Sequence, residues 1–156
     1  MNAPHAVLIG VGNPYRRDDG IGPAIVAAIE EFRPSGVTLT ISDGEPSQLL
    51  DAWSGADLAV VVDAVRCDPP APGQIHRTTL GSAAPGTAAA STHGLGIPDA
   101  VRLAEALDRA PRRLVVLAVE AADLSFGLGL SPAVAACWPE LIRAVRIELG
   151  LAPAAP

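Results

Sequence analysis

The segment AVLIGVGNPYRRDDGIGPAIVAAIEEF, residues 6–32, runs from a predicted strand through a glycine-containing turn into a predicted helix. Its first five residues are continuously apolar and end in glycine, which is typical of a strand buried on both faces of a sheet. Beyond the turn, isoleucine recurs every fourth residue from Ile21 to Ile29, and Phe32 continues that stripe. This spacing predicts an amphipathic helix, so the segment opens a layered α/β fold.

Strands and helices keep alternating after this unit. We predict strands at 37–42, 58–62, 74–79 and 113–119, and helices at 46–53, 99–108 and 132–149, the last broken or kinked at Pro139. The connection 63–73 contains three prolines and is shorter than the crossover of roughly a dozen or more residues that a parallel neighbour requires. We therefore expect an α/β fold with a mixed five-stranded sheet, in which the strand at 74–79 is antiparallel to the others.

Length and charge exclude several classes of protein. The 156 residues fit one domain over 1–156, with a core from about residue 6 to residue 149 and a frayed C-terminal tail. The net charge is −6 and all 11 basic residues are arginine, which argues against nucleic-acid and membrane partners and leaves no lysine for a Schiff base or a Walker motif. Cys67 and Cys137 are expected to be free thiols outside any metal-type cluster, in a cytoplasmic protein.

Three side chains are candidates for a metal site. Asp19 follows the first strand and its turn, Asp63 follows the third strand, and His93 precedes the helix at 99–108. Ligand sites of open α/β sheets gather at the carboxyl ends of the strands, where connections leave in opposite directions. Two carboxylates and one imidazole suit a borderline divalent ion with open coordination positions.

Each candidate also has a plainer interpretation. Asp18 and Asp19 would cap the following helix, Asp63 would accept hydrogen bonds from loop amides, and His93 would be a capping or surface residue. His5 and His76 are expected to be structural or exposed. A nucleotide-binding module is disfavoured, because a tyrosine stands where the dinucleotide fingerprint needs its third glycine. The sequence shows no nucleophile elbow and no convincing Cys/His pair.

Taken together, the motifs resemble the hydrogenase maturation proteases, the endopeptidases that trim the C-terminus of the large subunit of nickel–iron hydrogenases. The resemblance covers roughly residues 6 to 148. It rests on GVGN at 10–13 followed by DDGIG at 18–22, on VDA at 62–64, on STHGL at 91–95 and on GLGLSP at 127–132. Two segments depart from the family pattern: Glu45-Pro46 replaces part of a Gly-Gly-Thr stretch, and Glu120-Ala121 replaces Glu-Pro.

The resemblance implies a three-layer α/β/α sandwich of the phosphorylase/hydrolase-like type, with metal-ligating and catalytic roles for Asp19, Asp63 and His93. It implies hydrolysis of one peptide bond near the C-terminus of a hydrogenase large-subunit precursor, with nickel supplied by that substrate. Whether the metal polarises the scissile carbonyl or an aspartate activates the water stays open. The alternatives are a non-enzymatic metal-binding maturation chaperone of the same fold and, with less support, a nucleotide-binding module.

Overall fold

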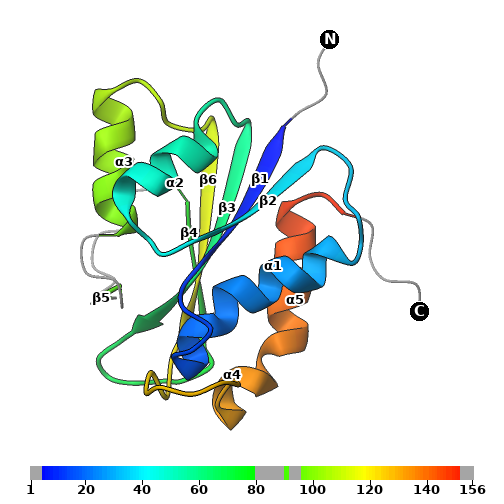
Figure 1. Ribbon diagram of the computed structural model, residues 1–156, viewed down its shortest axis with the longest axis vertical. Helices are drawn as coiled ribbons and strands as arrows, with labels where there is room; N and C mark the ends of the chain where they lie inside the picture. The colour runs from blue at the N-terminus through cyan, green and yellow to red at the C-terminus, as the bar shows by residue number, and fades with distance from the viewer. Residues whose placement is uncertain (1–4, 80–89, 92–95, 152–156) are drawn as a thin grey trace.

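A computed structural model describes residues 5–79, 90–91 and 96–151 of the chain (Figure 1). The strands are β1 (Ala6–Val11), β2 (Val37–Ser42), β3 (Leu58–Arg66), β4 (Ile75–Thr79), β5 (Ala90–Ser91) and β6 (Arg113–Glu120). The helices are a 3-10 turn η1 (Arg17–Gly20), then α1 (Ile21–Glu30), α2 (Pro46–Trp53), α3 (Ile97–Ala106), α4 (Pro132–Ala136) and α5 (Trp138–Glu148).

Five strands form the main sheet in the order β2-β1-β3-β6-β4. β1 is parallel to β2 and β3, and β6 is parallel to β3. β4 is antiparallel to β6 at one edge, which confirms the mixed sheet expected from the short, proline-rich connection before it. The two-residue strand β5 pairs antiparallel with the end of β3, and the rest of the segment 80–95 lies outside the described residues.

Helices cover both faces of the sheet and make three layers (Figure 1). One core lies beneath α1 and α5, where Ile25 and Leu141 pack with Val62 of β3. The other lies beneath α2 and α3, where Trp53 and Ala100 belong to the same buried cluster as strand residues of β1, β3 and β6. The predicted α/β/α sandwich is therefore confirmed.

Two glycines let α1 begin directly against β1. A β-carbon on Gly22 would lie 2.4 Å from the carbonyl oxygen of Val11, and one on Gly10 would lie 2.2 Å from the carbonyl oxygen of Gly22. No larger residue fits this approach without a backbone shift. The contact holds the turn 12–20 over the carboxyl end of β1, where the candidate site lies.

Two element boundaries bear on the predictions. β3 continues to Arg66, four residues beyond its predicted end, so Asp63 lies inside the strand. The C-terminal helical region is divided at Cys137, and Pro139 occupies the first turn of α5, as its inability to sit in a helix interior predicts. Within the described part of the chain, no helix is both long enough and apolar enough to cross a membrane.

Candidate functional site

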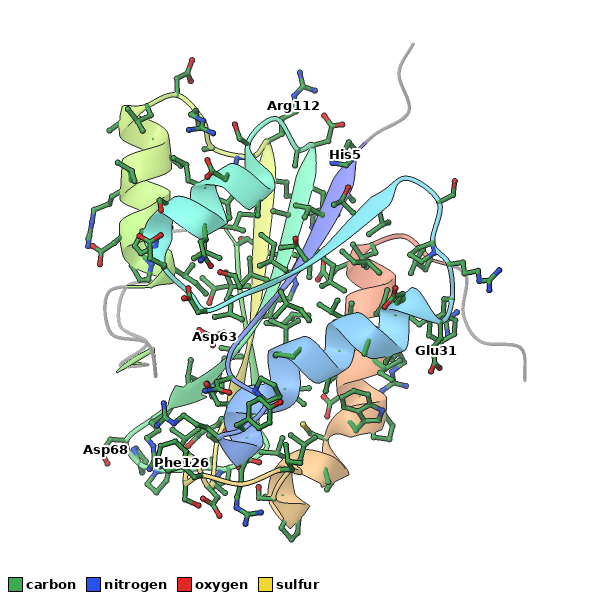
Figure 2. All side chains as sticks on the ribbon, in the orientation of Figure 1. His5, Glu31, Asp63, Asp68, Arg112 and Phe126 are labelled. Atoms are coloured by element: carbon green, nitrogen blue, oxygen red, sulfur yellow. The ribbon has the colours of Figure 1, made fainter. Side chains whose placement is uncertain are left out.

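The candidate site lies where the connections of the sheet diverge. β2 and β3 stand on opposite sides of β1, so the carboxyl end of β1 is a topological switch point. η1 follows this end and lies against β3, which carries Asp63. Asp63 is placed towards this end of the sheet (Figure 2). Both predicted acidic residues, Asp19 of η1 and Asp63, are about 1% exposed.

The turn between β1 and α1 fixes the position of Asp19. The Asn13 backbone N–H donates to Oδ2 of Asp19 at 2.9 Å. Gly12 has a φ of +141°, and a β-carbon there would lie 1.9 Å from the Asp19 carbonyl oxygen. The Gly12 N–H also donates to the Ser42 carbonyl oxygen at 3.0 Å, which ties the turn to the end of β2. The motif GVGN thus shapes the turn that holds this carboxylate.

Asp63 is a buried carboxylate inside the central strand. Its Oδ1 accepts the Ala64 N–H at 2.8 Å, so the amide concerned belongs to β3 itself and not to a loop. Val61 lies in the core beneath α2 and α3, and strand alternation puts Asp63 on that same face of the sheet. A carboxylate withdrawn from water in this way requires compensating polar or cationic partners.

His93 lies outside the described residues, so its place relative to the two aspartates remains a prediction. The nearest described residue before it is Ser91 in β5, which pairs with Val65 of β3. His5 lies at the other end of the molecule from the labelled Phe126 (Figure 2). His5 is exposed, which is one of the two outcomes expected for it, and its ring Nε2 lies 3.4 Å from the Thr38 hydroxyl.

Asp18 has a role that the sequence did not reveal. Its fully buried carboxylate accepts four hydrogen bonds: from the backbone N–H groups of Ala122, Asp123 and Ser131 at 2.9, 2.8 and 2.7 Å, and from the Ser131 hydroxyl at 2.8 Å. Neither Asp18 nor Asp19 is the N-cap residue of α1: that position is Gly20, which has no side chain to accept a capping hydrogen bond. Asp18 instead fastens the loop 121–131 to the first turn.

Backbone pairing joins the same two segments. The Arg17 N–H donates to the Gly127 carbonyl oxygen at 3.0 Å, and the Gly127 N–H donates to the Tyr15 carbonyl oxygen at 2.8 Å. The motifs DDGIG and GLGLSP are more than a hundred residues apart in the sequence. Hydrogen bonds therefore hold their two loops side by side at the carboxyl end of the sheet. Tyr15, Phe126 and Leu128 are exposed on these segments, and we call these three side chains the apolar rim.

The sequence matches a known family along most of its length. The model of the hydrogenase maturation protease HycI matches residues 23–147. The chain belongs to the hydrogenase maturation protease family. The hydrogenase expression/formation protein HoxM of Azotobacter vinelandii is 32% identical over 154 residues, covering 96% of this chain and 72% of that protein. The hydrogenase expression/formation protein HupD of Thiocapsa roseopersicina is 29% identical over 134 residues, covering 83% of this chain and 60% of that protein.

The fold of this maturation protease is also found in solved structures. The hydrogenase maturating endopeptidase HybD of Escherichia coli has a TM-score of 0.79 at 24% identity, over 94% of this chain and 92% of that one. The nickel–iron hydrogenase maturation protease HybD of Thermococcus kodakarensis has a TM-score of 0.71 at 21% identity, over 92% and 99% of the two chains. At these identities the likeness establishes the common α/β fold.

The two segments that depart from the family pattern have different surroundings. Glu45 begins α2: its carboxylate accepts the Gln48 N–H at 3.3 Å, and hydrogen bonds from Ser47 lower the pKa of this carboxyl below its ordinary value. Pro46 follows in the first helical turn, where proline is tolerated. Glu120 is buried at the end of β6, and its side chain belongs to a second polar group of the maturation protease.

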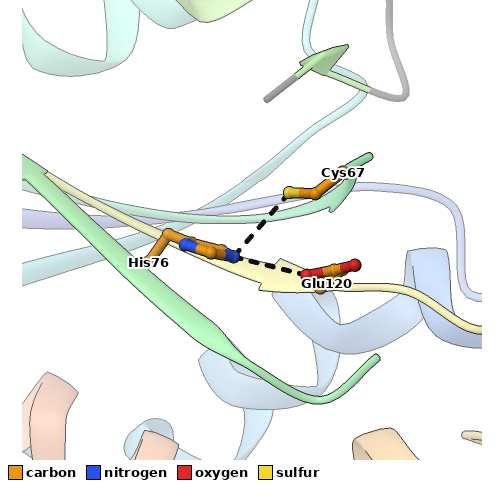
Figure 3. A group of neighbouring side chains, drawn as sticks. All are labelled: Cys67, His76 and Glu120. Carbon is orange, nitrogen blue, oxygen red and sulfur yellow. Dashed lines mark hydrogen bonds and ion pairs between the residues drawn. The ribbon is translucent and has the colours of Figure 1, made fainter. Parts of the chain in front are cut away.

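This second group consists of Cys67, His76 and Glu120 (Figure 3). Their ligand atoms all lie within 4.8 Å of one another, so the group could hold a metal ion. Neither a metal-type cluster at Cys67 nor a ligand role for His76 was predicted from the sequence. The described cysteines are both unpaired, as predicted. The cluster was missed because it depends on which strands neighbour one another and in what register.

The cluster does not have the arrangement of a thiol nucleophile with its base. Cys67 Sγ and Glu120 Oε2 approach the same ring nitrogen of His76, Nε2, at 3.7 and 3.4 Å. A catalytic triad uses the two ring nitrogens separately, one for the nucleophile and one for the acid. Burial, followed by the charge and hydrogen bonding of Glu120, raises the pKa of the Cys67 thiol, which disfavours the reactive thiolate.

Proposed function

We propose that this chain is a cytoplasmic endopeptidase that removes the C-terminal extension of a nickel-loaded large-subunit precursor of a nickel–iron hydrogenase. The observation that carries the proposal is the pair of buried carboxylates, Asp19 and Asp63, at the switch point of the sheet in a member of the maturation protease family. The names of the relatives support the substrate class, because both are hydrogenase expression/formation proteins. The two unpaired thiols favour a reducing compartment.

We assign His93 as the third ligand of this site. Ser91 pairs with Val65. Ser91 stands two positions before His93 in the chain, and Val65 stands two positions after Asp63. Antiparallel pairing brings together residues that are displaced in opposite directions from a paired position. The register of β5 against β3 therefore supports a position for His93 beside Asp63.

Nickel enters this scheme as part of the substrate. An open set of two carboxylates and one imidazole binds a divalent ion weakly on its own, and it gains affinity when the precursor brings the metal with its remaining ligands. A precursor without nickel offers nothing to these three residues and is rejected. Hydrolysis then adds water across the scissile amide: the water oxygen bonds to the carbonyl carbon, the C–N bond breaks, and a proton passes to the departing amine.

The apolar rim suits a protein substrate. Tyr15, Phe126 and Leu128 are exposed on the two segments that Asp18 joins beside the site. Exposed apolar side chains gathered around a polar centre are typical of protein-binding surfaces, and aromatic residues contribute strongly to such interfaces. We therefore assign the rim to docking of the folded precursor.

The proposal is tested by incubating the purified protein with a nickel-loaded precursor and determining the masses of the products. The expected result is one shortened large subunit and one released C-terminal peptide. A chaperone of the same fold would bind the precursor and leave its mass unchanged, so binding without cleavage would contradict the endopeptidase assignment.

Neither cysteine is expected to take part in cleavage. The double variant C67S/C137S should process the nickel-loaded precursor at a rate within about threefold of the parent, because its carboxylates and imidazole are intact and the Cys67 thiol is not activated. The rate is measured by gel shift, with circular dichroism as the control for folding. Complete loss of cleavage in the folded double variant would instead favour a thiol nucleophile.

A further inference from the structure

The group Cys67, His76 and Glu120 brings together the ends of three strands. Cys67 directly follows β3, His76 lies in β4, and Glu120 is the last residue of β6 (Figure 3). The distance from Sγ to Nε2 is 3.7 Å and the distance from Nε2 to Oε2 is 3.4 Å. These three residues come from separate parts of the sequence, and each presents a different donor element: sulfur, nitrogen and oxygen.

These spacings are close to those of ligands around one tetrahedral ion. Zinc bonds of about 2.3 Å to sulfur and about 2.0–2.2 Å to nitrogen and oxygen, at tetrahedral angles, place sulfur and nitrogen about 3.5 Å apart and nitrogen and oxygen about 3.4 Å apart. The observed separations are 3.7 and 3.4 Å. Two of the three separations therefore match a tetrahedral ion, and the third, between Cys67 Sγ and the carboxylate oxygen of Glu120, is no more than 4.8 Å.

Glu120 is held ready for such a role. Its other oxygen, Oε1, accepts the backbone N–H of Ala71, which fixes the carboxylate plane and leaves Oε2 facing His76. The side chain is about 1% exposed. A buried carboxylate is stabilised by a nearby cation. Carboxylates that bind metal ions are oriented by hydrogen bonds from neighbouring groups, here to the oxygen that faces away from the metal.

We propose that Cys67, His76 and Glu120 bind one Zn²⁺ ion, at a site that shares no ligand with Asp19, Asp63 and His93. Three protein ligands leave the fourth tetrahedral position to water. Thiolate and imidazole select zinc and similar borderline ions over Mg²⁺ and Ca²⁺, which prefer oxygen ligands throughout. The His76 Nε2 faces both the thiol and the carboxylate, and a neutral ring can offer only one proton there; a metal ion satisfies all three groups at once.

The sheet register places this site beside Asp63. Ala118 of β6 pairs with Asp63 on one side and with His76 on the other, so the three residues form one row across β3, β6 and β4. Residues paired in this way point to the same face of a sheet, and two strand spacings separate the outer two by about 9–10 Å. The bound ion would join the edge strand β4 to its neighbour β6 and to the end of β3.

Cobalt substitution tests the proposal with a readout that depends on sulfur. We expect the metal-free full chain to bind one Co²⁺ with a thiolate-to-cobalt absorption band in the near ultraviolet, and Zn²⁺ to displace it. C67S should lose this band, whereas the matched control C137S should keep it. H76Q, changed at a partly exposed side chain, should bind Zn²⁺ more weakly by at least about tenfold. Loss of a residue that only hydrogen-bonds to a metal ligand already lowers metal affinity about 10–100-fold, and His76 is proposed to be a ligand itself.

The proposed zinc site is distinguished from the nickel-recognition site by D63N. The nickel-recognition site contains no sulfur, so the thiolate–cobalt band cannot arise from it. D63N, which alters only that site, should therefore leave the band unchanged. The proposal is overturned if the folded parent shows no thiolate–cobalt band, if the band persists in C67S, or if H76Q binds Zn²⁺ as tightly as the parent. Thermal unfolding of each metal-free variant shows whether it is folded. If C67S is not folded, the zinc affinity of H76Q tests the proposed site in its place.

Discussion

The variant D63N is expected to stay folded and to lose cleavage of the nickel-loaded precursor, with a rate at least about a hundredfold below that of the parent. Asparagine keeps the shape of the side chain, and its amide oxygen can still accept the Ala64 N–H. It lacks the negative charge and much of the ligand strength of aspartate. H93A is expected to show the same loss. The rate is measured by gel shift on purified precursor.

D51N provides a matched control. Asp51 is an exposed aspartate of α2 that pairs with Arg109 at 3.2 Å. It is not one of the residues assigned to the site, so its replacement should leave cleavage unchanged. Full activity of D63N would remove Asp63 from the site. Equal loss in D51N would show that the assay reports a general effect of charge.

The variant D18A is expected to lose about 3–5 kcal/mol of the free energy of unfolding. Removal of this carboxylate leaves the N–H groups of Ala122, Asp123 and Ser131 and one hydroxyl without their acceptor, and each buried donor left unpaired costs about 1–3 kcal/mol before water relieves part of the loss. Urea unfolding followed by circular dichroism gives the difference in free energy.

S131A is the graded partner of this experiment. It removes only the hydroxyl hydrogen bond to Asp18 and keeps the three backbone donors, so its expected effect is about 1 kcal/mol. If the free energy of unfolding of D18A lies within about 1 kcal/mol of that of the parent, the loop 121–131 is held by other contacts. The role assigned to Asp18 is then wrong. D18A and S131A together test whether Asp18 stabilises the contact between the loop 121–131 and the first turn. Asp63, in contrast, is expected to affect the reaction.

The sequence predicted those elements whose signals are local. The alternating residues 37–42 and the segment 46–53 with its leading proline match β2 and α2 at both ends. The antiparallel edge strand followed from loop length alone. β3 was underestimated because its last residues are held by pairing with β5 and β6, which lie far along the chain.

The candidate site could be predicted only in part. Asp63 was found because a charge directly after a run of valines is unusual, and the turn motif pointed to Asp19. The role of Asp18 depends on a loop more than a hundred residues away, and the group Cys67, His76 and Glu120 depends on the register of β4 against β6. Local sequence carries no information about such long-range pairings.

The most direct test of nickel-gated processing compares two forms of one precursor, metal-free and nickel-loaded, incubated with the unaltered protein under the same conditions. Docking must order the site and the tail of the substrate, and without the metal–ligand bonds this cost is not offset. We predict that the nickel-loaded precursor is shortened and the metal-free precursor is left intact. Cleavage of both forms at the same rate would contradict recognition through nickel.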